Sequence, residues 1–291
     1  MTDKIIALVD GSIYSASVCE HAAWIAERTG APVELLHVLG RREGAETSDL
    51  SGSIRLGART ALLEELAALD AQRAKLVAHR GRAILDDAHA LLEGAGVTDV
   101  TTRLRHGDIV ETVAEVEQEA RVILIGKRGE AADFAKGHLG SNLERIVRAC
   151  HKPVFVAARA FRPIEKVLLA YDGGTSAMKA VDHIARSPLF AGLRVHVVTV
   201  GAATPEVKKA ARRRQQGLED ARALLAAAGI VAETGVIAGQ PETALGKLVD
   251  EAGFDMVVMG AYGHSRIRSL IIGSTTTEMV RSCKVPVVLL R

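Results

Sequence analysis

Short apolar runs alternate with longer amphipathic segments along most of the chain. Residues 4–10 read KIIALVD, an apolar run closed by an aspartate, and an amphipathic segment then extends to Gly30. A glycine directly after a helical pattern is typical of a helix C-terminus. The next run, VELLHV at 33–38, predicts a second strand. Continuous apolar strands that alternate with helices indicate a parallel sheet covered by helices on both faces.

The same pattern occurs twice. KIIALVD at 4–10 returns as KVLLAYD at 166–172, and a step of 28 residues leads from each aspartate to Val38 or Val200. GSNLERIVRACHKPVFVA and GSTTTEMVRSCKVPVVLL, which begin at Gly140 and Gly273, share Gly-Ser, Val-Arg, Cys and Pro-Val in register. Chance does not produce so many ordered matches. We therefore predict an α/β protein of two tandem Rossmann-like domains, each a doubly wound, five-stranded parallel sheet, over 1–158 and 164–291.

The first half contains a helical insert at about 41–80. Its aspartate-to-Gly126 step is 28 residues longer than the equivalent step to Gly260 in the second half. Residues 58–93 carry one long helical pattern, in which one face holds Leu62, Leu66, Leu69, Leu76, Ile84 and Leu91. An unbroken helix would extend roughly 54 Å and offer an arm to another copy or a partner. A break at Gly81 would instead give two shorter helices packed on the first domain.

Composition excludes several functional classes. Lys+Arg 37 against Asp+Glu 35 leaves a net charge of +2, and aromatic residues make up 3%, so nucleic-acid binding is not expected. The chain has no apolar stretch of about 18 residues and no leader-like N-terminus, so we expect a cytoplasmic protein without a membrane partner. Cys19, Cys150 and Cys283 lack metal-ligand spacing and are interpreted as free, buried thiols. We expect no metal site in the protein itself.

The carboxyl ends of the strands in the second half carry the candidate chemistry. In open parallel sheets, ligands bind at this edge. Here Asp172 ends one strand, and Met259-Gly260 ends another and opens a loop with a second glycine, Gly263. Gly273-Ser274 then begins a helix. Glycines let backbone N–H groups approach phosphate oxygens, and a helix N-terminus attracts the same anion. The spacing Gly-x2-Gly-x9-Gly-Ser therefore indicates a phosphate site.

This arrangement resembles the ATP-binding branch of the universal stress protein family. The similarity rests on the strand-end aspartate, the glycine spacing and the Cys-x2-Pro-Val final strand, and it spans the chain as two domains, apart from the insert. It implies that Asp172 meets the adenosine, that the backbone at Val200 meets the adenine, and that the glycine loop holds the phosphates. The implied site consists of Asp172, Val200, Met259, Gly260, Gly263, His264, Gly273, Ser274 and Thr275.

The first half departs from this pattern. Ten residues, not nine, separate Gly129 from Gly140, and they include two acids that would repel a phosphate. Ser141-x-x-Glu144 is typical of a capping box, which would occupy the helix N–H groups internally. Lys127, Arg128 and Lys136 could offset the acids, so a second, weaker site stays open. Its residues are Asp10, Val38, Gly126, Gly129, Gly140 and Ser141.

Other motifs do not add up to an active site. Asp10, Ser12 and His37 could be drawn as a hydrolase triad, but no Gly-x-Ser-x-Gly elbow is present. The chain also lacks the dehydrogenase fingerprint and the P-loop. His138 and His264 lie in the glycine loops without a carboxylate nearby in sequence to orient them. We therefore assign no catalytic residue.

The sequence predicts an ATP-binding regulatory protein rather than a metabolic enzyme, with Mg²⁺ carried by the nucleotide and at most slow ATP hydrolysis. We expect a homo-oligomer, such as a dimer, with room for an unidentified protein partner. Two alternatives stay open. An ATP-hydrolysing or adenylating enzyme on a related fold should show Ser-Gly-Gly-x-Asp-Ser or His-x-Gly-His, and neither occurs. An adaptor that binds no nucleotide would use only its surfaces.

Overall fold

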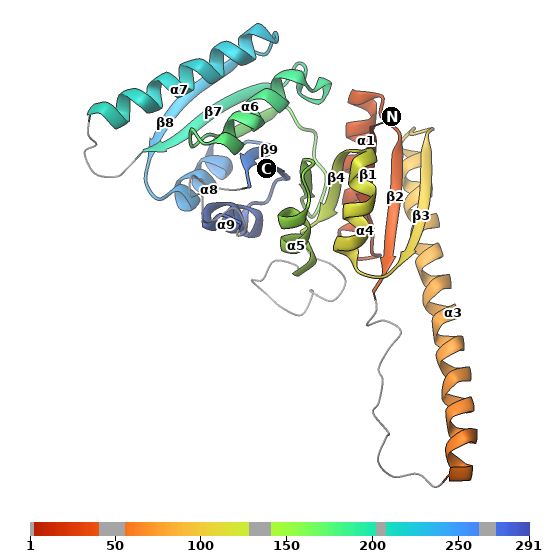
Figure 1. Cartoon of the computed structure of the whole chain (residues 1–291). Helices are drawn as coiled ribbons and strands as arrows, with labels where there is room; N and C mark the ends of the chain where they lie inside the picture. Colours follow the sequence, from red (N-terminus) through yellow and green to blue (C-terminus); the bar gives the residue numbers. More distant parts are fainter. Residues whose placement is uncertain (1–2, 41–55, 128–140, 202–207, 262–271) are drawn as a thin grey trace.

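The computed structural model describes residues 3–40, 56–127, 141–201, 208–261 and 272–291 (Figure 1). In the first half, the elements are β1 (Lys4–Leu8), α1 (Ser15–Thr29), β2 (Val33–Leu39), α3 (Leu56–Gly94), β3 (Val100–His106), α4 (Ile109–Val116), η1 (Glu117–Glu119), β4 (Ala120–Gly126), α5 (Ser141–Ala149) and β5 (Val154–Ala157). In the second half they are β6 (Lys166–Ala170), α6 (Thr175–Arg186), η3 (Pro188–Phe190), β7 (Arg194–Gly201), α7 (Lys208–Ala227), β8 (Ala232–Ala238), α8 (Pro241–Ala252), β9 (Met256–Gly260), α9 (Ser274–Ser282) and β10 (Val287–Leu290).

The ten strands form one sheet in the order β3-β2-β1-β4-β5-β10-β9-β6-β7-β8. Strands within each half pair in parallel, as the alternation of strands and helices predicts. The two halves join where β5 and β10 pair antiparallel, with Phe155 opposite Val288. The doubly wound α/β class is thus confirmed. The sequence did not indicate that the two sheets would merge into one.

Helices cover both faces of the sheet, because the central strands are apolar on both sides. Buried residues of α1, α3, α6 and α7 join one core cluster, and those of α4, α5, α8 and α9 join the other. The winding direction therefore reverses between β1 and β4 in the first half and between β6 and β9 in the second. These two places are the switch points at which such sheets bind ligands.

The three cysteines are free and buried, as predicted. Burial raises the pKa of the Cys19 and Cys150 thiols to about 12, so both are protonated at neutral pH. The described helices include none that is long and apolar enough to cross a membrane.

The helix α3 is continuous over 39 residues, and Gly81 does not break it. Gly81 is buried where the helix lies closest to the sheet. A Cβ there would sit 2.9 Å from Leu104 Cδ1 and 3.0 Å from His37 Cδ2. The glycine therefore serves a close contact between helix and sheet, and the alternative of two shorter helices is wrong.

The leucine face of this helix is not the one that covers the sheet. The buried positions near its C-terminal end are Leu85, Ala88 and Leu92, whereas Leu91 is 48% exposed. At roughly 100° per residue, these buried positions lie about a quarter turn from the predicted stripe of Leu62 to Leu91. The residues of the stripe do lie on one side of the helix, as their spacing requires. The domain leaves most of that side uncovered.

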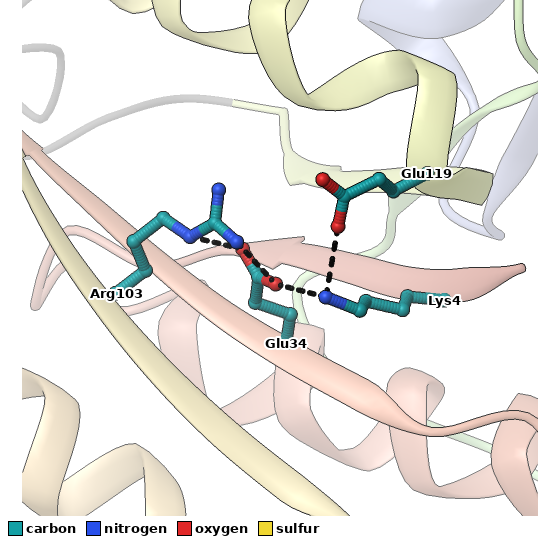
Figure 2. Close-up of polar contacts among 4 residues, drawn as sticks. All are labelled: Lys4, Glu34, Arg103 and Glu119. Carbon is teal, nitrogen blue, oxygen red and sulfur yellow. Dashed lines mark hydrogen bonds and ion pairs between the residues drawn. The ribbon is translucent and has the colours of Figure 1, made fainter. Parts of the chain in front are cut away.

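A charged cluster lies near the amino ends of the first-half strands (Figure 2). The carboxylate of Glu34 is buried and pairs with Lys4 at 3.0 Å and with Arg103 at 2.7 Å. Lys4 also reaches Glu119 at 2.9 Å, and its two carboxylate partners, Glu119 and then Glu34, raise its pKa. These bonds tie β1, β2 and β3 together at the edge opposite the candidate site.

Candidate nucleotide-binding site

Gly260, the last residue of β9, lies against the first turns of two helices. A Cβ on Gly260 would sit 2.7 Å from Ser176 Cβ in α6 and 3.3 Å from the backbone nitrogen of Ala177. From the other face, Thr276 Oγ1 in α9 donates a hydrogen bond to the Gly260 carbonyl oxygen at 3.1 Å. Only a residue without a side chain fits here. The positive N-terminal ends of α6 and α9 therefore meet at the carboxyl edge of β9.

The start of α9 lies beside the end of β9. The backbone N–H of Gly273 donates to the carbonyl of Ala261 at 3.2 Å, so the two ends of the intervening segment meet. Gly273 is the N-cap and has no side chain to cap the helix. Thr277 makes the first intrahelical bond, to the Gly273 carbonyl at 2.9 Å. The backbone N–H groups of Ser274, Thr275 and Thr276 thus lack intrahelical acceptors, which is the arrangement that binds anions.

Asp172 follows β6 and begins the turn into α6. Its Oδ1 accepts the Gly174 N–H at 2.8 Å, and Gly173 adopts a φ of +78° that favours glycine. Asp172 is exposed at the sheet edge. Val200 is half-buried near the end of the adjacent strand β7. Asp172 and Val200 therefore lie on neighbouring strands at the same edge as Gly260.

The structure brings most of the predicted site together. Asp172, Val200, Met259 and Gly260 follow or end three adjacent strands, β6, β7 and β9, and Met259 is buried under the edge. Gly273, Ser274 and Thr275 join them through the bond between Gly273 and Ala261. Gly263 and His264 lie outside the described residues. The site thus combines backbone N–H donors and side-chain hydroxyls with one carboxylate.

Ser176 packs against Gly260 and Thr276 bonds to it, and the sequence pattern did not reveal those roles. The Thr276 hydroxyl is buried and bonded to Gly260, so it faces the strand end rather than a ligand. The signal for Ser176 was the strand-end glycine itself, since a glycine beside a helix start often marks a close approach. Which helix approaches could not be read from spacing.

A separate cleft of about 470 Å³ lies between α8 and α9. It shares Ser274 with the candidate site, but Glu242, Asp250 and Glu278 line it. Three carboxylates would repel a triphosphate, so we do not assign the nucleotide to this cleft.

The first half holds an incomplete counterpart. Asp10 follows β1, and its Oδ1 accepts the Ser12 N–H at 3.0 Å, while Gly126 ends the neighbouring strand β4. Val38 is half-buried near the end of β2. Gly129 and Gly140 lie outside the described residues, and Ser141 begins α5. The Ser141 side chain is not described, so the capping box is untested.

Two features of the first half bear on its chemistry. Lys127, interpreted from sequence as a possible phosphate partner, is buried and donates instead to the carbonyl of Cys283 in the second half. The His37 ring bonds the Val9 carbonyl through Nδ1 at 2.7 Å. Asp10 accepts instead from Ser12 N–H and from Ser15 Oγ. These bonds do not form the relay that a Ser-His-Asp triad requires.

Comparison with known proteins identifies the family of this chain. A model of the universal stress protein family matches residues 1–158 and again 163–291. Universal stress protein Slr1230 of Synechocystis is 37% identical over 290 residues, which cover 99% of both chains. Universal stress protein Mb2019 of Mycobacterium bovis is 26% identical over 254 residues, 76% of this chain and 78% of that one.

The fold has a counterpart among solved structures. A universal stress protein from Archaeoglobus fulgidus superposes with a TM-score of 0.72 at 20% identity, over 100% of this chain and 99% of its own. The repeated family match and the full-length relative lead to one conclusion: this chain belongs to the universal stress protein family, as two family domains in tandem.

Proposed function

We propose that the second domain binds ATP and that the protein acts as a nucleotide-dependent regulator in the stress response, not as a metabolic enzyme. The observation that carries the proposal is the meeting of two helix N-termini at Gly260, on the switch point of the sheet. The N–H groups of Ser274 and Thr275 would face the phosphates, and Asp172 would face the adenosine. Val200 would offer backbone groups to the adenine.

The proposal includes Mg²⁺ carried by the nucleotide. Its charge would be matched mainly by the phosphates, which are hard oxygen ligands of the kind Mg²⁺ prefers. Gly263 and His264 remain in the proposal on sequence grounds alone.

The weaker site of the first domain also remains a proposal. Asp10, Val38 and Gly126 occupy positions equivalent to those of the second domain. The bond from Lys127 to Cys283 directs one cation of this loop away from a ligand. We therefore expect ATP binding to be dominated by the second domain, in a protein located in the cytoplasm.

Substitution of Gly273 tests the proposal. Its backbone, at φ −59° and ψ 143°, is open to any residue, so Gly273→Val should fold. A branched side chain would block backbone approach to the phosphate and abolish ATP binding in calorimetry. Gly140→Val, at the equivalent position of the first half, is the matched control and should keep the parent's affinity. Unchanged affinity in Gly273→Val would contradict the proposal, and nucleotide retained through purification, identified by mass spectrometry, would support it.

The rate of ATP hydrolysis distinguishes a regulatory protein from an enzyme. We identify no base positioned for hydrolysis, so steady-state ATP hydrolysis with Mg²⁺ should stay far below the roughly 10 s⁻¹ of a typical enzyme. A sustained rate of that order would favour the hydrolysing or adenylating alternative. Absence of any nucleotide binding would favour an adaptor.

A further inference from the structure

The helix α3 is much longer than its counterpart in the repeat. It lies between the second and third strands of its half, as α7 does in the other half. The buried residues Leu85, Ala88 and Leu92 of α3 correspond at constant spacing to Leu218, Ala221 and Leu225 of α7. Yet α3 has 39 residues and α7 has 20. The surplus lies at the N-terminal end of α3 and amounts to roughly 28 Å of helix.

This surplus leaves the domain. Figure 1 shows α3 extending well beyond the strands that its C-terminal half covers. On residues 62–80, here named the α3 arm, Leu69 is 55% exposed and Leu76 is 72% exposed, and Leu62 and Leu66 on the same side are half-buried. Helices gain most of their stability from packing an apolar face, and exposed leucines on one side of a helix mark an interaction surface.

Charges are sorted along the α3 arm. The half farther from the domain, 62–70, carries Glu64, Glu65 and Asp70 and no basic residue. The half nearer the domain, 71–80, carries Arg73, Lys75 and Arg80 with His79 and no acidic residue. Two such arms side by side in parallel would place like charges together. In antiparallel orientation, the acidic half of each would lie against the basic half of the other.

We propose that the α3 arm pairs antiparallel with the same arm of a second copy of this chain. The leucines at 62, 66, 69 and 76 form the seam. Arg73 lies on the same side of the helix and Glu65 and Asp70 flank it, and these charges set the direction of the seam. The contact is isologous, since each arm supplies the same surface, and it closes as a two-fold dimer. A second copy is the occupant because the charge pattern of the arm complements itself. The proposal is independent of nucleotide binding.

Light scattering after size-exclusion chromatography tests the seam. The full-length parent should have the mass of two chains, and Leu69→Lys with Leu76→Lys should have the mass of one. The control, Ala67→Lys with Ala71→Lys, adds the same charge on the opposite side of the helix and should remain a dimer. A parent that is a single chain at tens of micromolar would overturn the proposal. So would a leucine variant that keeps the parent's mass while its far-UV circular dichroism is unchanged.

Charge reversal tests the orientation. Glu65→Lys with Asp70→Lys makes the acidic half basic beside the leucines, and Arg73→Glu makes the basic half acidic there. Each variant alone should lose dimer, and an equimolar mixture of the two should recover it. The threefold variant reverses the polarity beside the seam and should dimerise by itself. A threefold variant that stays a single chain would overturn antiparallel pairing.

Discussion

The side chain of Lys127, just beyond β4 in the first half, donates a hydrogen bond to the carbonyl oxygen of Cys283 in the second half. Cys283 is the C-cap of α9, so the buried ammonium lies at the negative end of that helix. The opposite end of α9 carries Ser274 and the candidate phosphate donors. One cation of the first half thus anchors the helix on which the site of the second half depends.

Loss of this anchor should weaken the joint between the halves. Lys127→Met leaves the carbonyl of Cys283 without its buried donor, and we expect a loss of about 1–3 kcal/mol in the free energy of unfolding. Urea titration followed by circular dichroism measures it. Lys179→Met removes the same charge at an exposed position and should change stability by less than about 0.5 kcal/mol. Equal losses in both variants would contradict the role assigned to Lys127.

The buried carboxylate of Glu34 should matter far more than its exposed neighbour. Glu34→Ala would leave Lys4 and Arg103 without their shared partner, and we expect about 3 kcal/mol of destabilisation. Glu119→Ala removes a half-exposed partner of Lys4 and should cost far less, because solvent screens an exposed ion pair. Chemical denaturation of the two variants gives the comparison. ATP affinity should be unchanged in both, because the cluster lies at the opposite edge of the sheet.

Gly81 in α3 and Gly246 in α8 are two helical glycines with different surroundings, so Gly246 can serve as the control for the contact between α3 and the sheet. At Gly246 in α8, nothing lies within 4 Å of an added Cβ, so Gly246→Ala should stabilise the protein by about 1 kcal/mol through helix propensity. Gly81→Ala gains the same propensity but meets the packed side chains of Leu104, His37 and Leu39. Overpacking typically costs about 1–3 kcal/mol, so we expect net destabilisation. Thermal unfolding that shows equal stabilisation would refute close packing at Gly81.

His21 should make the protein sensitive to mild acid. The ring is fully buried between Phe155 and Phe161, and burial lowers its pKa to about 4. The unfolded chain, with a pKa near 6.5, therefore binds more protons than the folded chain between these values, and stability is lost as pH falls through this window. We expect about 2 kcal/mol less stability at pH 5 than at pH 7 from His21 alone.

His21→Phe is the test of this assignment. The variant cannot titrate at this position, so the difference in unfolding free energy between pH 7 and pH 5 should shrink by that amount. His183, whose pKa burial also lowers, keeps its smaller share in both proteins. An unchanged pH dependence in His21→Phe would show that the ring is not held neutral.

Much of this architecture followed from local pattern. The alternation of apolar runs with amphipathic segments predicted the strands and helices, and the internal repeat predicted the two doubly wound halves. The spacing of Asp172, Gly260 and Gly273 placed the candidate site at the strand ends, because parallel strands bring their carboxyl ends to one edge. The long pattern at 58–93 predicted a helix that the structure shows at Leu56–Gly94. These properties depend on residues close in sequence or on rules common to all such sheets.

Other features were decided only by tertiary packing. The pairing of β5 with β10, the bond from Lys127 to Cys283 and the seat of Gly260 against Ser176 join residues distant in the chain. Whether Gly81 would break α3 or pack it against the sheet depended on how near β2 and β3 lie, which spacing does not record. The sequence alone determined two tandem domains and the winding of each. Which face of each element is buried depended on contacts between distant segments, because burial is a property of surfaces and not of single residues.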